Sequence, residues 1–171
     1  MNNPRFKIKS KKKSGNSLSQ MPFISWTERM SVNVKLLDND NKRLAILINE
    51  LHHGVMAGRD KQALDLAFEW LIGNIHVHFA HETQLFVETG YPDAAFHELE
   101  HDNLLDRFKD LLARFKSETE LSGYLEVMNL AKGWLFGHIQ SSDQDYVPHL
   151  KAMDADFLMA KRQSPIPVMR G

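Results

Sequence analysis

Histidines and carboxylates recur at helical spacing along otherwise apolar faces of this sequence. His78 and Glu82 are four residues apart, and so are His97 and His101. Because an α-helix completes a turn about every 3.6 residues, each pair projects from one face of its helix. Imidazoles mixed with carboxylates, in a chain without cysteine, suit a divalent ion such as iron, zinc or manganese. The spacing therefore predicts a helical protein that holds a metal.

Apolar residues at steps of three and four predict four long helices. The first follows the N-cap residue types at 38–40, carries Leu44, Ile46, Leu47, Ile48 and Leu51 on its apolar face, and fades near Gly54. The others span about 60–89, 94–116 and 121–141, and a short fifth helix is expected around 150–158. Short links favour antiparallel neighbours, so the expected fold is all-α, an antiparallel up-down-up-down four-helix bundle.

The two ends of the chain differ from its middle. Residues 1–20 hold six Lys or Arg and no acid, and they lack the apolar periodicity and interleaved aromatics of a nucleic-acid or membrane ligand. We expect a disordered basic arm at 1–21, the bundle at 22–160 and a flexible tail at 161–171. Irregular apolar residues at the start of the bundle predict an N-terminal strap: Phe23, Ile24, Trp26, Val32, Val34 and Leu36.

Composition excludes several classes of protein. A chain of 171 residues with 43% hydrophobic content is sufficient for one domain with a real core. Without cysteine there are no disulfides, Cys-ligated clusters or thiol nucleophiles. No apolar run is long enough for a membrane span or a signal peptide, so a cytoplasmic protein is expected. The sequence shows no arrangement of a nucleophile with a general base, no phosphate-binding glycine loop and no nucleic-acid motif, which favours a binding protein over an enzyme. No feature indicates an oligomeric state.

A third candidate pair, His138 and Asp143, is five residues apart. Five residues rotate a regular helix by about 140°, so spacing alone does not bring these side chains together. They converge only if the helix end widens or the chain breaks, which Ser141 and Ser142 permit.

Taken in order, these motifs resemble those of the bacterial hemerythrins, a family of oxygen-binding four-helix bundles that hold two irons. The family pattern has a Trp, then Asp-x-x-His-Lys-x-Leu, His-Phe-x-x-Glu, Gly-Tyr-Pro before His-x-x-x-His, and Trp-Leu-x-x-His-Ile with a later Asp. The matching residues here are Trp26, Asp38, Lys42, Leu44, His78, Phe79, Glu82, Gly90, Tyr91, Pro92, His97, His101, Trp134, Leu135, His138, Ile139 and Asp143. The likeness runs from about residue 23 to about residue 150.

The resemblance implies a role for each residue of the site. Glu82 and Asp143 would bridge two irons, the first iron would be completed by His97, His101 and His138, and His78 would serve the second. Phe79, Trp134 and Leu135 would line a dry oxygen pocket. The implied function is dioxygen binding as a carrier, store or sensor, with dioxygen or another small diatomic molecule as the partner and only incidental oxidase or peroxidase activity.

One position departs from the family pattern. Asn41 stands where the first-helix His should be, and a neutral amide oxygen is a poorer ligand for ferrous iron than imidazole. Among the remaining histidines, His81 is the candidate substitute to watch. Two alternatives to a diiron centre therefore stay open: one firmly held metal with a labile or empty second position, and a metal-free interaction bundle.

Overall fold

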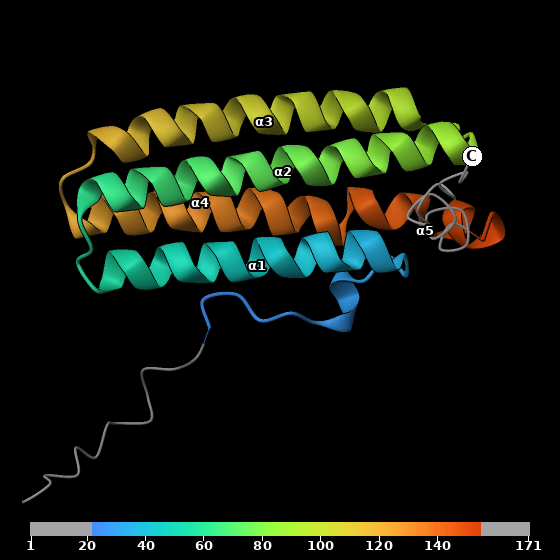
Figure 1. The fold of residues 1–171 in the computed structure, drawn as a ribbon. Helices are drawn as coiled ribbons and strands as arrows, with labels where there is room; N and C mark the ends of the chain where they lie inside the picture. The colour runs from blue at the N-terminus through green and yellow to red at the C-terminus, as the bar shows by residue number, and fades with distance from the viewer. Residues whose placement is uncertain (1–21, 155–171) are drawn as a thin grey trace, which may run out of the picture.

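The computed structural model describes residues 22–154, and Figure 1 shows four long helices lying side by side. The described elements are η1 (Glu28–Met30), α1 (Lys35–Met56), α2 (Lys61–Thr89), α3 (Ala94–Ser117), α4 (Leu121–Gln140) and α5 (Ser142–Ala152). Consecutive long helices run in opposite directions, and no strand occurs within this range. The predicted all-α, antiparallel four-helix bundle is confirmed.

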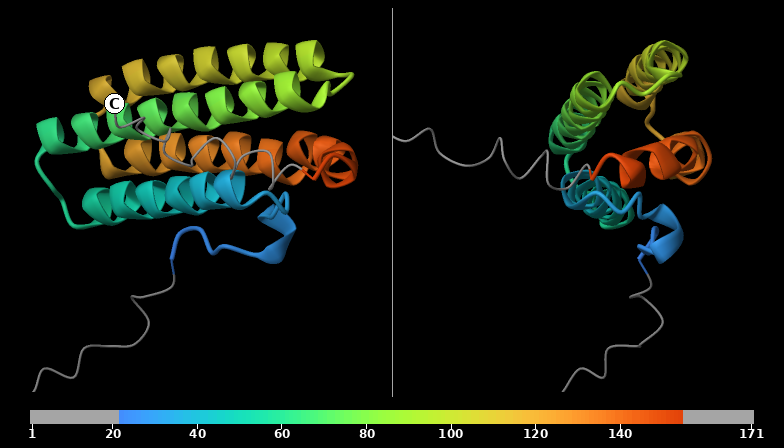
Figure 2. Two further views of the ribbon diagram at one scale, coloured as in Figure 1. Left: turned by 45° about the vertical axis from the view of Figure 1, so that its right-hand side comes forward. Right: turned by 90° about the vertical axis from the view of Figure 1, so that its right-hand side faces the viewer.

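The helices form a closed square when the bundle is viewed along its length (Figure 2). α1 packs against α2 and α4, and α3 packs against the same two helices. Two local signals fix where α2 begins and ends. Asp60 accepts hydrogen bonds from the amides of Gln62 and Ala63 at the start of α2, and Gly90 ends the helix with a φ of 66° that favours glycine.

Two expectations about the first helix are wrong. α1 begins at Lys35 rather than after Asp38, because Asp38 binds the preceding segment instead of capping a helix: its carboxylate accepts hydrogen bonds from the Ser31 hydroxyl (2.7 Å) and the Val32 amide (2.8 Å). Ile46 was expected on the inward face, yet 56% of it is exposed. Its neighbours Leu44 and Ile48 are buried, so Ile46 lies on the outer side of the helix.

The N-terminal strap is confirmed as residues 22–34, which run along the bundle beneath α1 (Figure 1). The Asn49 amide bonds the backbone of Ile24 twice, accepting from its N–H at 2.7 Å and donating to its carbonyl at 2.8 Å. Lys132 of α4 donates to the Phe23 carbonyl at 2.8 Å. The strap therefore ties α1 to α4 through backbone contacts as well as through its apolar side chains.

The apolar core consists of two clusters rather than one. The larger cluster fills most of the bundle, and the smaller one joins the strap, the C-terminal part of α2 and α5. Along α1, α2 and α3, buried polar residues stand where the apolar stripe is interrupted: Asn41, His78, Glu82, His97 and His101. A polar layer thus divides the two clusters.

Some expectations concern residues that lie outside the described range. The basic arm at 1–21, the flexible tail at 161–171, and Phe157 and Leu158 of the expected fifth helix all fall there. The part that is described contains α5, which starts earlier than expected, at Ser142. Of the helices in residues 22–154, none has the length and apolar character that crossing a membrane requires.

The Asn49 contacts generate a stability prediction. Asn49→Ala should lower the free energy of unfolding by about 1–3 kcal/mol, because the strap loses two hydrogen bonds and the Ile24 backbone is left unpaired. Urea unfolding followed by circular dichroism measures the change. Asn74→Ala is the matched control, since the exposed Asn74 amide bonds only a carbonyl of its own helix. Equal effects of the two substitutions would contradict this view of the strap.

Candidate metal centre

α2 carries the first pair of the polar layer. His78 and Glu82 are one turn apart on the face that also buries Ile75 and Leu85, and neither side chain is exposed to solvent. The His78 Nε2 lies 3.6 Å from the Glu82 Oε2. The predicted projection of both side chains from one face of this helix is what the structure shows.

α3 brings a second pair toward the same space. The Nε2 of His101 lies 3.1 Å from the Glu82 Oε2, and the Nε2 of His97 lies 3.4 Å from Oδ1 of Asp143. Both imidazoles are almost fully buried. α2 and α3 therefore place four polar side chains in one layer of the bundle.

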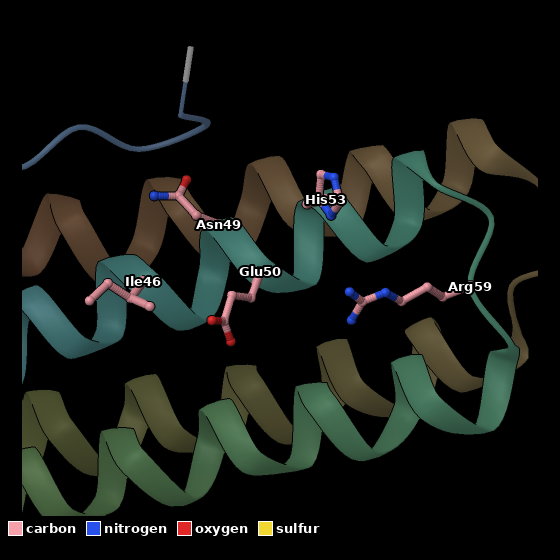
Figure 3. A pocket seen from close by; sticks show the side chains of 5 residues that line it. All are labelled: Ile46, Asn49, Glu50, His53 and Arg59. Atoms are coloured by element: carbon pink, nitrogen blue, oxygen red, sulfur yellow. The ribbon is translucent and has the colours of Figure 1, made fainter. Parts of the chain in front are cut away.

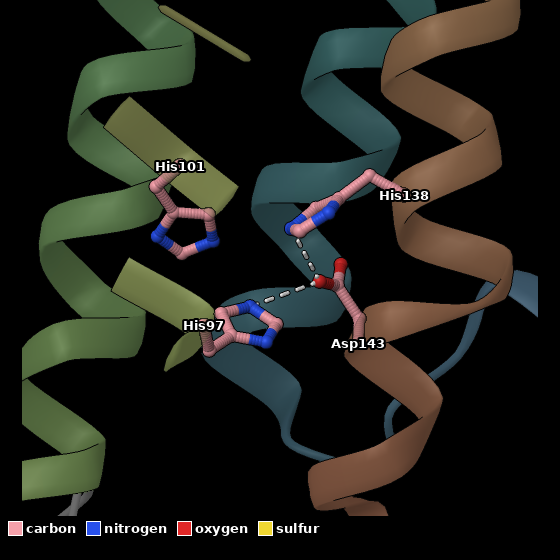
Figure 4. A group of neighbouring side chains, drawn as sticks. All are labelled: His97, His101, His138 and Asp143. Carbon is pink, nitrogen blue, oxygen red and sulfur yellow. Dashed lines mark ion pairs between the residues drawn. The ribbon is translucent and has the colours of Figure 1, made fainter. Parts of the chain in front are cut away.

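The chain breaks between His138 and Asp143. α4 ends at Gln140, Ser141 leaves the helical region (φ −120°, ψ −81°), and α5 starts at Ser142. The break turns Asp143 back toward His138, whose Nε2 lies 3.1 Å from Asp143 Oδ1. Figure 4 shows the rings of His97 and His138 turned toward this carboxylate, with both ion pairs dashed. Of the two possibilities that the sequence left open, a widened helix end and a break at the serines, the structure has the break, and it brings His138 and Asp143 together.

The ligand-type atoms gather into two overlapping groups. One contains His97, His101, His138 and Asp143, and the other contains His78, Glu82 and Asp143; within each group the atoms lie within 4.8 Å of one another. Asp143 belongs to both groups. The structure thus brings together all six of the residues that the sequence pointed to as metal ligands.

Eight polar atoms of the six ligand-type residues have no hydrogen-bond partner among the described residues. They are His78 Nδ1 and Nε2, Glu82 Oε2, both carboxylate oxygens of Asp143, and the Nε2 atoms of His97, His101 and His138. The contacts of 3.1–3.4 Å between them lack hydrogen-bond geometry. Since leaving a buried polar atom unpaired costs about 1–3 kcal/mol, so many in one layer indicate a shared partner that binds lone pairs. The donor set fits a divalent metal.

Burial decides which of these groups carry charge. It lowers the pKa of His78 to about 4 and, with the neighbouring imidazoles of His97 and His138, lowers the pKa of His101 to about 2. Burial raises the pKa of Glu82 well above its ordinary value, and the nearby Asp143 raises it further. These imidazoles are therefore neutral at physiological pH, with lone pairs free for a metal.

Asp143 keeps its charge in the same surroundings. Burial by itself raises the pKa of Asp143, but the imidazoles of His138 and His97 outweigh burial and hold it below the usual range. The carboxylate shared by both groups is therefore an anion, which favours a cation between them.

Tyr146 is a residue of the centre that sequence reasoning missed. Its hydroxyl donates a hydrogen bond to Glu82 Oε1, and the side chain is fully buried in the smaller apolar cluster. Burial and the adjacent Glu82 raise the pKa of Tyr146 well above its ordinary value, so the hydroxyl keeps its proton. The available signal was helical spacing, because Tyr146 stands three residues after Asp143 on α5.

The geometry agrees with comparisons to known proteins. The family model described as "Hemerythrin HHE cation binding domain" matches residues 32–150. The chain belongs to the hemerythrin family. The match includes all four long helices and most of α5, and therefore every residue of the polar layer.

The chain is similar to several known proteins over most of their length. It is 29% identical over 134 residues to a Bacteriohemerythrin of Methylococcus capsulatus, covering 77% of this chain and 100% of the relative. It is 27% identical over 132 residues to a Bacteriohemerythrin of Stenotrophomonas maltophilia, covering 77% and 84%. A crystal structure of wild-type hemerythrin superimposes with a TM-score of 0.66 at 27% identity, covering 75% of this chain and 98% of the other.

Asn41 lies in the polar layer, where it carries an amide rather than the imidazoles and carboxylates of which the ligand groups consist. It stands on the inward face of α1 between the buried Leu37 and Leu44, is itself fully buried, and has no hydrogen-bond partner for its amide oxygen or nitrogen among the described residues. Neither ligand group includes a residue of α1. The first helix therefore faces the centre with an amide that the rest of the layer does not engage.

His81 lies at the flank of the bundle rather than in the centre. It is partly exposed, and its Nδ1 contacts the Asp40 carboxylate of α1 at 2.7 Å. It is absent from both ligand groups. The structure thus does not make His81 a substitute for the imidazole that the family pattern has at position 41.

The three residues expected around the oxygen pocket have different surroundings. Phe79 stacks on the His101 ring at 3.7 Å between centroids and meets His138 edge-on. Leu135 is fully buried in the larger apolar cluster. Trp134 is only partly buried, with the Arg107 guanidinium 5.4 Å from its ring centroid. Phe79 is therefore the one of the three in direct ring contact with the imidazoles.

Surface hollows lie on more than one side of the bundle, and two of them differ in their relation to the centre. One, of about 520 Å³, is lined by residues that include His97, Glu100, Asp145 and His149, so it reaches the edge of the centre from the α3 and α5 side. The other, of about 430 Å³, lies on the outer side of α1 and is lined by Ile46, Asn49, Glu50, His53 and Arg59 (Figure 3). No residue of the second hollow belongs to the centre.

The lowered pKa of His78 predicts a pH dependence of stability in the metal-free protein. Between pH 4 and 6.5 the unfolded chain binds a proton at His78 that the folded chain excludes, so stability falls as the pH falls through this window. His78→Gln should make this decline shallower by up to about 1.4 kcal/mol per pH unit, the value for one proton. Urea unfolding in chelator at several pH values measures both slopes.

The control is His76→Gln, which makes the same change at an exposed position of α2. This variant should keep the wild-type slope. Parallel curves for the wild type and His78→Gln would show that His78 is not held neutral by the fold.

Proposed function

We propose that this chain is a non-haem iron protein that binds dioxygen, acting as a carrier, store or sensor rather than as an enzyme. The observation that carries the proposal is the convergence of imidazoles from three helices, unpaired and buried, on one carboxylate. Membership of the hemerythrin family supports iron as the metal.

Each of the two ligand groups would hold one iron. His97, His101 and His138 would hold the first iron and His78 the second. Asp143, which belongs to both groups, would serve both irons, and Glu82 belongs to the group of His78 and lies 3.1 Å from His101 of the other. Iron bound there would supply reversible electron donation to dioxygen. Imidazoles outnumber carboxylates in this set, whereas diiron proteins of the ferritin type use mostly carboxylates, and this difference favours binding over turnover.

The rest of the chain keeps the centre dry and fixed. Phe79 stacks on the His101 ring, Leu135 is fully buried in the larger apolar cluster, and Tyr146 holds Glu82 through its hydroxyl. A dry, apolar surrounding keeps water and protons away from a bound gas molecule. These contacts support the proposed reversible binding.

Exposure to air tests the proposal. Anaerobic, reduced, iron-loaded protein should develop a visible absorption band in air, and the band should fade when oxygen is removed. His101→Ala should lose iron and the band, whereas His76→Ala, at an exposed position, should behave as the wild type. The proposal is refuted if the spectrum of the iron-loaded wild type does not change with oxygen, or if the wild type retains no iron.

A second candidate is a centre with one firmly held metal, and Asn41 favours it. The first group offers four ligand residues, while the group that contains His78 offers three, one of them shared. The Asn41 amide faces this layer as a weak ligand. A labile or empty second position would leave more exchangeable sites on the metal and favour oxidation over reversible binding.

Metal content per chain distinguishes the two candidates. If the second is right, the wild type should retain about one metal after desalting, and Asn41→His should raise the content to about two by adding an imidazole from α1. Asn103→His is the matched control, because it adds an imidazole at an exposed position of α3 and should change nothing. Two metals in the wild type would reject the second candidate in favour of a diiron centre.

A further inference from the structure

Resting on the proposed metal centre, we propose that Asp40, anchored by His81, is a positioning residue for His78 that strengthens this imidazole as a ligand. Asp40 precedes Asn41 on α1 and is not a member of either ligand group. Through Asp40, the first helix would act on the second half of the centre without supplying a ligand itself.

The two ring nitrogens of His78 face two different carboxylates. Nε2 lies 3.6 Å from Glu82 Oε2 inside the centre, and Nδ1 lies 4.0 Å from Asp40 Oδ2 on the side of α1. A metal that sits with Glu82 and Asp143 is therefore reached by Nε2. Asp40 faces the other ring nitrogen, so it would not compete with a metal bound at Nε2.

When an imidazole binds a metal through Nε2, its Nδ1 has to donate a hydrogen bond. When Nε2 donates its lone pair to a metal, the neutral ring carries its proton on Nδ1, and that N–H needs an acceptor. His78 is fully buried, and Nδ1 has no hydrogen-bond partner among the described residues. The Asp40 carboxylate faces Nδ1 from a distance that a small side-chain shift closes to a hydrogen bond. A carboxylate in this position makes the imidazole a stronger donor and fixes its orientation.

His81 holds the Asp40 carboxylate in place. Its Nδ1 contacts Asp40 Oδ2 at 2.7 Å, and the pair sits at the flank, with the side chains of His81 and Asp40 31% and 18% exposed. His81 lies three residues after His78 on α2, so one helix presents both imidazoles to the same carboxylate of α1. Without this contact the Asp40 side chain could turn outward into water.

Cobalt titration of the full chain tests the proposal. Co²⁺ absorption reports each half of the centre, and the phase that His78→Gln abolishes belongs to the second half. Asp40→Asn should weaken this phase by about 10- to 100-fold, leaving the phase of His97, His101 and His138 unchanged. Asp40→Glu should recover part of the loss. Glu50→Gln is the control, because it removes one charge from the outer side of the same helix.

Two further measurements separate positioning from general stability. His81→Gln, at a partly exposed position, should weaken the same phase less than Asp40→Asn does. In zinc-loaded protein with labelled histidine, the Nδ1 proton resonance of His78 should shift upfield in Asp40→Asn, because the carboxylate acceptor is lost, but not in Glu50→Gln.

The outcomes distinguish this proposal from the proposed function. The proposal is overturned if the wild type binds no cobalt at His78, or if Asp40→Asn binds there as the wild type does. Either result leaves the proposed function to be decided by its own test, the response of the iron-loaded protein to air. Cobalt bound at both halves, with iron-loaded protein that ignores oxygen, would refute the function and leave the positioning role standing.

Discussion

The burial of imidazoles and carboxylates in the middle of an apolar bundle is the constraint on which the rest of the structure depends. Burial keeps His78 and His101 neutral and raises the pKa of Glu82, while Asp143 stays charged. A layer of this kind is unfavourable until a cation satisfies its lone pairs. The two apolar clusters on either side hold the layer in register, so the energy needed to assemble the site comes from packing elsewhere.

The fold and the pairs of polar residues on α2 and α3 could be predicted because both follow from helical periodicity, whereas the pairing of His138 with Asp143 came only from the resemblance to the hemerythrins. His78 with Glu82 and His97 with His101 are neighbours on single helices, and such neighbours can be identified by counting residues. Features that depend on tertiary contacts could not be obtained in this way. The Asp40 and His81 contact joins residues 41 positions apart, and Asp38 reached back to the strap instead of starting a helix. The direction of the chain after Ser141 also depends on packing that spacing does not encode.

The centre is asymmetric in what each helix supplies. α3 gives two imidazoles to one group, whereas α1 gives neither group a ligand and faces the layer with the unpaired amide of Asn41. His78, the imidazole of the other group, has its outer nitrogen 4.0 Å from the Asp40 carboxylate, the same distance that separates the outer nitrogen of His138 from the Glu100 carboxylate. The group that contains His78 thus faces a carboxylate outside it, and this carboxylate belongs to α1.

The short helix α5, of eleven residues, supplies two side chains of the centre. Asp143 belongs to both ligand groups and Tyr146 holds Glu82, so detachment of this short segment removes a shared anion and a supporting hydroxyl together. The four long helices can stay packed while this happens, because the larger apolar cluster contains no residue of α5. Fraying of α5 alone would therefore open the polar layer at one end of the molecule without global unfolding.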